Sequence, residues 1–84
     1  MKLLKFYADW CGPCKTLSNT MKLVKFPFPV ENLNIEDGLG MDLAMKYGVR
    51  GVPALILVDE EGVPIKAVSG AKTKQELEEL FVNT

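Results

Sequence analysis

Two cysteines, Cys11 and Cys14, lie three positions apart near the start of the chain, and they are its only cysteines. The chain also has no histidine. A tetrahedral zinc site normally needs four nitrogen, sulfur or oxygen ligands, and neither a second cysteine pair nor a histidine is available to complete one. Two thiols at this spacing can instead close into a disulfide and reopen. The pair therefore predicts reversible dithiol–disulfide chemistry, with no metal and no other cofactor.

A helix is predicted to begin at the two cysteines, because Cys14, Leu17, Met21 and Val24 recur at spacings of three and four. Only a thiolate attacks a disulfide, and an ordinary thiol with a pKa of about 8.5 is only about 3% ionised at neutral pH. Free amides and the dipole at a helix N-terminus favour the thiolate. We expect Cys11 to be the more exposed thiol and the attacking group that forms a mixed disulfide. Cys14, one turn inside, would donate a hydrogen bond to Cys11 and then resolve that mixed disulfide.

Length and composition predict one domain, residues 1–84, with 48% hydrophobic residues available for its core. Met21, Met41 and Met45 are expected to fill gaps in that core. The formal net charge of −1 is unlike the strongly basic surface of nucleic-acid-binding proteins. No stretch approaches the roughly 18 apolar residues of a membrane span, and Lys5 and Asp9 interrupt the apolar start before a signal peptide could form. We therefore expect a monomeric cytoplasmic protein that binds neither nucleic acid nor membranes.

Hydrophobic patterns and breaker residues predict four strands and three helices. Gly48 suits the left-handed cap of a helix, and Thr73 with Glu76 forms a capping box that opens the last helix. The expected strands cover residues 2–8, 30–35, 54–58 and 64–68. The expected helices start near the cysteines and end before residue 27, cover 39–47, and begin after 73. This order implies an α/β fold with a parallel crossover followed by an antiparallel hairpin.

The segment Ala8–Lys15 (ADWCGPCK) after the first strand resembles the thioredoxin family. Residues 46–53 (KYGVRGVP) look like the thioredoxin segment that ends in a cis-proline, and residues 69–71 fall where thioredoxins place a glycine loop before the last helix. The resemblance covers nearly the whole chain and implies a minimal thioredoxin fold, β-α-β-α-β-β-α, with a four-stranded mixed sheet flanked by three helices. The N-terminal strand and helix typical of thioredoxins are missing, which leaves a core of glutaredoxin size.

The resemblance also implies a substrate-binding surface around the cysteines. In thioredoxin-like proteins the residue before the cis-proline offers backbone hydrogen bonds to an extended substrate, which assigns that role to Val52 and a cis bond to Val52–Pro53. Trp10 is expected to be a partly exposed lid over the cysteines. A groove that binds main chain reads little sequence and suits many protein substrates. The full set of expected substrate-binding residues is Trp10, Gly12, Pro13, Val52, Pro53, Gly70 and Ala71.

Lys5 lies six residues before Cys11, where thioredoxins usually carry a buried aspartate, and the lysine partner of that acid is absent from residues 31–34. The proton-relay role of that aspartate therefore cannot be carried over. Two interpretations of Lys5 remain. Its stem could lie in the core while its ammonium reaches water. Alternatively, Lys5 could lie under the active site and lower the pKa of a cysteine thiol by opposite charge.

The leading interpretation is an enzyme, a thiol–disulfide oxidoreductase that reduces protein disulfides and serves electron transport and cell redox homeostasis. The Gly12–Pro13 pair resembles that of reducing thioredoxins, so a thioredoxin reductase-type enzyme or another electron donor would re-reduce Cys11 and Cys14. A first alternative is a glutaredoxin-like reductase that depends on glutathione. A second is a binding subunit of a larger assembly that acts independently of its thiols.

Overall fold

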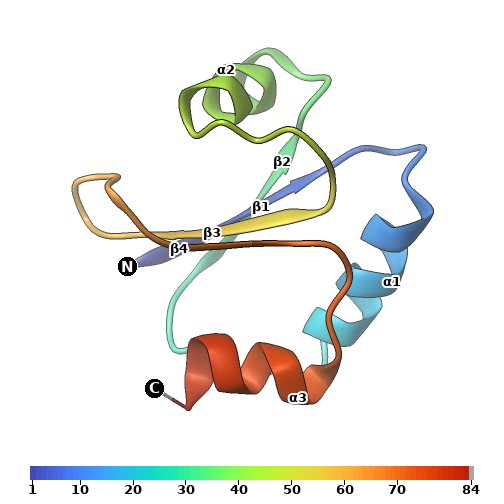
Figure 1. Ribbon diagram of the computed structural model, residues 1–84, viewed down its shortest axis with the longest axis vertical. Helices are drawn as coiled ribbons and strands as arrows, with labels where there is room; N and C mark the ends of the chain where they lie inside the picture. Colours follow the sequence, from blue (N-terminus) through green and yellow to red (C-terminus); the bar gives the residue numbers. More distant parts are fainter. Residues whose placement is uncertain (84) are drawn as a thin grey trace.

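Four strands form one mixed sheet in the computed structural model, which describes residues 1–83 (Figure 1). The strands are β1 (Lys2–Tyr7), β2 (Val30–Asn34), β3 (Ala54–Val58) and β4 (Pro64–Ser69). Their order across the sheet is β2-β1-β3-β4. The central strand β1 is parallel to β2 and antiparallel to β3, and β4 is antiparallel to β3 at the edge. A parallel crossover followed by an antiparallel hairpin was predicted, and both are confirmed.

Three helices cover the two faces of this sheet. Helix α2 (Gly38–Lys46) lies on one face, while α1 (Gly12–Met21) and α3 (Lys74–Leu77) lie on the other (Figure 1). The C-terminal helix continues past α3 as a π-helical stretch, Glu78–Val82. The predicted α/β arrangement of a four-stranded mixed sheet and three helices is therefore confirmed. None of the helices within residues 1–83 has the length and apolar character needed to cross a membrane.

Strand β1 contributes to the hydrophobic clusters on both faces because successive side chains of a strand alternate. Leu3 packs in the cluster with α1 and the C-terminal helix, which we call the α1/α3 cluster. Leu4 and Phe6 pack in the other, the α2 cluster. The buried members of the α1/α3 cluster are Leu3, Leu17, Met21, Val24, Leu55, Leu57, Leu77 and Phe81. Those of the α2 cluster are Leu4, Phe6, Leu33, Ala44, Ala54, Ile56 and Val58.

Local signals fix the ends of the elements. Gly48 adopts a φ of 70° just after α2, as its predicted left-handed cap requires. The capping box of α3 is confirmed, with Thr73 Oγ1 accepting from the Glu76 backbone N–H and the Glu76 carboxylate accepting from the Thr73 N–H. Helix α1 ends at Met21, earlier than predicted, because hydrogen bonds such as Val24 N–H to Met21 O tighten its last turn.

The methionines do not all lie in the core. Met21 is buried in the α1/α3 cluster as predicted. Met41 and Met45 are exposed, Met45 by 76%, so the prediction that they fill core gaps is wrong. Helix α2 is too short to bury a broad stripe, and it buries Gly40 and Ala44 instead. Met41 and Met45 each follow one of these buried positions, which turns them about 100° around the helix toward solvent.

Candidate active site

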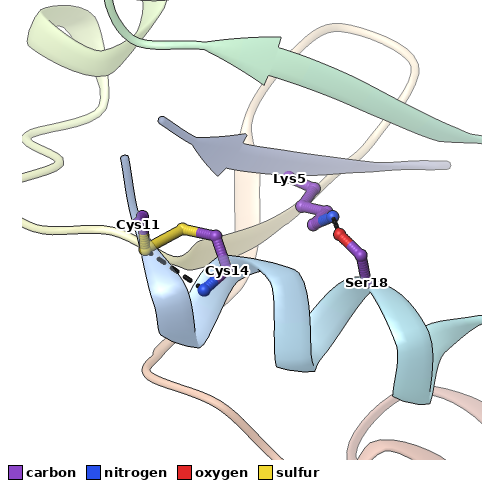
Figure 2. The surroundings of a disulfide bond; sticks show 4 residues. All are labelled: Lys5, Cys11, Cys14 and Ser18. Atoms are coloured by element: carbon purple, nitrogen blue, oxygen red, sulfur yellow. Dashed lines mark hydrogen bonds between the residues drawn. A yellow bond between two sulfur atoms is a disulfide. The ribbon is translucent and has the colours of Figure 1, made fainter. Parts of the chain in front are cut away.

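The first turn of α1 holds both cysteines. Cys11 is the N-cap residue, with extended backbone geometry, and Cys14 lies in the first helical turn. Their sulfurs form a disulfide, with the Cα atoms 5.2 Å apart, a normal separation for a protein disulfide. The Cys14 backbone N–H donates a 3.1 Å hydrogen bond to Cys11 Sγ (Figure 2). Pro13 occupies the start of the helix, where its missing N–H leaves no intrahelical bond unmade.

Both cysteines are almost fully buried in this disulfide form. Cys11 is 4% exposed and Cys14 is 3% exposed, so the expected difference in exposure is not present. The reason is a small apolar cluster in which Ala8 packs on the two cysteines, with Tyr7, Ile35 and Val52 partly buried against them. Cys14 donates a hydrogen bond to Cys11, as expected, and in this disulfide form the donor is its backbone amide.

The residues that pack on the cysteines come largely from the carboxyl ends of the two parallel strands. Tyr7 ends β1, and Ala8 follows it, while Ile35 follows the last residue of β2. Sequence reasoning missed Ala8 and Ile35 as members of the site. The signal was available, because residues just beyond the carboxyl ends of neighbouring parallel strands meet at one edge of an α/β sheet.

The loops before β3 and after β4 approach the same end of the sheet. The Val52–Pro53 peptide bond is cis, and Val52 packs against the cysteine cluster. Gly70 has a φ of 84° and donates its N–H to the Pro53 carbonyl over 2.9 Å. This bond ties the glycine loop to the proline loop. Gly12, between the cysteines, and Ala71, after Gly70, are both exposed.

Trp10 is 69% exposed and lies beside the cysteines. Its indole lines a groove of about 260 Å³ together with Met41 and Met45 of α2 and with Ile35 and Val52. The residues packed directly on the cysteine cluster are Tyr7, Ile35 and Val52. The groove therefore links the neighbourhood of the disulfide to the exposed side of α2.

Lys5 is buried, at 5% exposure, so its ammonium does not extend into bulk water. Its Nζ donates a hydrogen bond to Ser18 Oγ of α1 (Figure 2). The same Nζ lies 5.7 Å from the centre of the Tyr7 ring. The pKa of Lys5 is lowered, first because burial desolvates the ammonium and second because Lys22 repels it. Lys5, Tyr7, Ser18, Lys22 and Asn32 all line one open cavity of about 510 Å³.

Metal ligands do not gather anywhere in residues 1–83, since no group of three histidine, cysteine, aspartate or glutamate side chains is placed to hold an ion. The reactive groups that the structure does show in the site are the two sulfurs. A closed Cys11–Cys14 disulfide at a helix start can accept two electrons, and the resulting thiols can return them.

Comparison with known proteins gives the same fold and the same chemistry. The thioredoxin family model matches residues 1–83. A thioredoxin of Pseudomonas aeruginosa is 37% identical over 79 residues, which cover 89% of this chain and 70% of that protein. The SPbeta prophage-derived thioredoxin-like protein YosR of Bacillus subtilis is 34% identical over 81 residues, covering 96% of this chain and 95% of that protein.

Solved structures agree with these sequence matches. A mutant thioredoxin from Halobacterium salinarum superposes with a TM-score of 0.83 at 34% identity, over 95% of this chain and 70% of that one. Thioredoxin of Fasciola hepatica shares the fold, with a TM-score of 0.80 at 23% identity, over 94% of this chain and 75% of that one. With its cysteine pair closed at the start of α1, the chain belongs to the thioredoxin family and is a thiol–disulfide oxidoreductase that reduces protein disulfides.

Proposed function

We propose that Cys11 is the attacking thiolate and Cys14 the resolving one. Cys11 Sγ attacks one sulfur of a substrate disulfide and forms a mixed disulfide with it. The substrate S–S bond breaks, and the other substrate sulfur leaves as a thiolate that takes up a proton. Cys14 Sγ, after losing its proton, then attacks Cys11 Sγ, the mixed disulfide breaks, and the substrate sulfur that was bound to Cys11 leaves as a thiolate that takes up a proton. The substrate gains two electrons, and the protein is left with the Cys11–Cys14 disulfide.

The observation that carries this assignment is the hydrogen bond from the Cys14 N–H to Cys11 Sγ. A helix has no internal acceptors for its first N–H groups, and a negative atom at the N-cap position satisfies one of them while meeting the positive end of the helix dipole. Hydrogen bonds to an ionised acceptor are about twice as strong as neutral ones. The same bond therefore favours the Cys11 thiolate over its thiol, which lowers the thiol pKa.

Substrate main chain is proposed to bind across the loops around the disulfide. Val52, packed on the cysteine cluster and followed by Pro53, offers backbone groups to an extended segment. Gly70 donates a backbone hydrogen bond to Pro53 and has no side chain, so a substrate can approach this loop closely. The complete proposed contact surface is Trp10, Gly12, Pro13, Val52, Pro53, Gly70 and Ala71.

The cellular setting of the reaction is also a proposal. Residues 1–84 form one monomeric domain in the cytoplasm, where an external donor of two electrons regenerates the thiols and no further cofactor takes part. A thioredoxin reductase-type enzyme is the proposed donor, because Gly12 and Pro13 between the cysteines resemble reducing thioredoxins. Reduction of a substrate pool by this route is electron transport that serves redox homeostasis.

Single cysteine variants test the assignment. Insulin reduction is measured for the wild type, Cys11→Ser and Cys14→Ser, with a thioredoxin reductase and NADPH or with glutathione as donor. Cys11→Ser should lose turnover and form no covalent complex. Cys14→Ser should also lose turnover but accumulate a mixed disulfide through Cys11, visible by mass spectrometry. Turnover retained by Cys11→Ser would contradict the assignment, and faster turnover with glutathione would make glutathione the donor.

A further inference from the structure

Lys5 is the only charged side chain that is buried in the part of the chain that the structure describes. It lies in the middle of β1, the central strand, opposite Asn32 of β2 and Leu55 of β3. Burying an ammonium group is unfavourable unless an opposite charge or several hydrogen bonds compensate. The surroundings of Lys5 therefore ought to contain an anionic partner.

In the disulfide form, none of residues 1–83 supplies such a partner around the amine. Ser18 accepts one hydrogen bond from Lys5, and the Tyr7 ring faces the ammonium. The only other charged group in the cavity wall is Lys22, which repels it, and no aspartate or glutamate lines this cavity. The titratable groups facing Lys5 from the elements around it are thus Tyr7 and Lys22.

Reduction creates an anion close to this unpaired ammonium. Ser18 follows Cys14 by four residues in α1, so the two side chains lie one turn apart on one face, with Cβ atoms about 5–6 Å from each other. Figure 2 shows both on the side of α1 that faces β1, with Lys5 reaching from β1 to Ser18. The Cys14 sulfur is neutral in the disulfide and can become a thiolate when the disulfide opens.

We propose that the Lys5 ammonium is the internal counter-charge of the Cys14 thiolate in the reduced protein, and that the Ser18 hydroxyl holds the amine in place. This inference rests on the proposed role of Cys14 as the resolving thiolate. Lys5 acts here as a positioning residue, because it forms no bond to substrate. Lys5 lines an open cavity, so protons can exchange at its amine although the side chain is only 5% exposed.

The sign of the effect follows from which form is stabilised. Lys5 stabilises the reduced protein when Cys14 is a thiolate and Lys5 is protonated. At a pH where both conditions hold, Lys5 therefore makes the disulfide easier to reduce. Below the pKa of the Cys14 thiol there is no thiolate to stabilise. Above the pKa of Lys5 there is no cation. The influence of Lys5 on the redox equilibrium is therefore confined to the pH interval between these two values.

Linkage makes the same coupling visible from the lysine. The Lys5 side chain is titrated by NMR in the oxidised and the reduced wild-type protein. An ammonium that lowers a thiol pKa has its own pKa raised equally by the thiolate, so the pKa of Lys5 should be higher in the reduced protein. In reduced Cys14→Ser this increase should be absent, because only the Cys11 thiol remains. Equal Lys5 titrations in the oxidised and reduced wild type would overturn the proposal.

Variants test the reciprocal effect on the thiol. Lys5→Met keeps an unbranched buried side chain without the charge, and Lys25→Met removes an exposed lysine as the matched control. A neighbouring opposite charge shifts a pKa by about one unit, so Lys5→Met should weaken Cys14 thiol ionisation about tenfold. Its redox equilibrium constant against glutathione should shift about tenfold toward a stronger reductant above the thiol pKa, about 30 mV for two electrons. Lys25→Met should leave both quantities unchanged.

The outcomes separate this inference from the proposed function. If turnover depends on Cys11 and Cys14 while Lys5→Met changes neither the thiol pKa nor the redox equilibrium, the cycle stands and the counter-charge role fails. Ser18→Ala should give a shift in the same direction as Lys5→Met but smaller, because the amine remains while its holding bond is lost. If Lys5→Met does not fold, the wild-type titrations still decide the question.

Discussion

The two faces of the sheet are built differently. On the α2 side, β1 places Leu4 and Phe6 in a wholly apolar cluster with Ala44. On the α1 side, the position between them on the same strand is Lys5, whose ammonium reaches Ser18 beside an open cavity. On the α2 side β1 therefore buries only apolar side chains, and on the α1 side it buries a charge beside the helix that carries the cysteines.

The two faces therefore differ in what they can contribute. One stabilises the sheet, and the other carries a charge that can act on nearby ionisable groups. A close-packed apolar layer stabilises the sheet without influencing the ionisation of nearby groups. An ammonium in a poorly hydrated site acts strongly on any neighbouring thiolate, because its charge is less screened than in water. Both faces meet at the cysteine cluster, where Ala8 follows β1 and Ile35 follows β2. The α2 face thus supports the site, and the α1 face is where we propose that a charge adjusts the chemistry of the thiols.

The largest expected change in stability comes from the α2 cluster. Phe6→Ala removes a fully buried ring from the α2 cluster and should lower the free energy of unfolding by about 3–5 kcal/mol. The neighbouring Lys5→Met, on the other face, should be neutral or stabilising, because it removes a desolvated charge. Urea unfolding of both variants measures the contrast. A larger loss from Lys5→Met than from Phe6→Ala would reverse our interpretation of the two faces.

Two glycines of α2 differ in how closely their backbones approach β2. A Cβ on Gly40 would overlap the backbone carbonyl of Asn34 at the end of β2, whereas a Cβ on Gly38 meets nothing within 4 Å. Gly40→Ala should therefore cost about 1–3 kcal/mol through overpacking. Gly38→Ala should be neutral or stabilise by up to about 1 kcal/mol, since alanine is the better helix former. Similar thermal unfolding of the two variants would argue against direct packing of α2 on β2.

Substitutions at the N-caps of α2 and α3, which lie on opposite faces of the sheet, should differ less in their effect on the free energy of unfolding. Thr73 caps α3 with its side chain, while Asp37, the N-cap residue of α2, makes no side-chain capping bond. Thr73→Ala should cost about 1 kcal/mol, the usual value of a lost N-cap. Asp37→Ala should cost less, because it removes a favourable charge but no hydrogen bond. Equal losses in denaturant unfolding would show that the capping box adds nothing.

The smallest expected effect is a pH dependence at the same cap. The pKa of Glu76 lies below its usual value, first because its carboxylate accepts a hydrogen bond from the Thr73 backbone N–H and second because the Thr73 hydroxyl favours the ionised form. A lowered folded-state pKa contributes stability above the unfolded value of about 4.5, and this contribution is lost as the pH falls through the lowered value. The stability difference between wild type and Glu76→Gln should therefore disappear in acid. A difference that persists at low pH would contradict this.

Much of this molecule follows from rules that act over a few neighbouring residues. The order of strands and helices, the left-handed Gly48 and the capping box of Thr73 with Glu76 were all predictable, because turn geometry and capping depend on adjacent side chains. The reactive pair was equally clear, since Cys11 and Cys14 are near in the sequence and no other cysteine or histidine competes for the assignment.

Contacts between segments distant in the sequence could not be predicted in this way. The near-complete burial of Cys11 depends on Ile35 and Val52, which other loops bring to it, and the exposure of Met45 depends on which side of a short helix meets the sheet. That Lys5 donates a hydrogen bond to Ser18 is equally a matter of tertiary structure, and the thiol-tuning interpretation of Lys5 stays a prediction. Such facts depend on the register of β1 against its neighbours and on the placement of α1, and a local pattern carries no information about either.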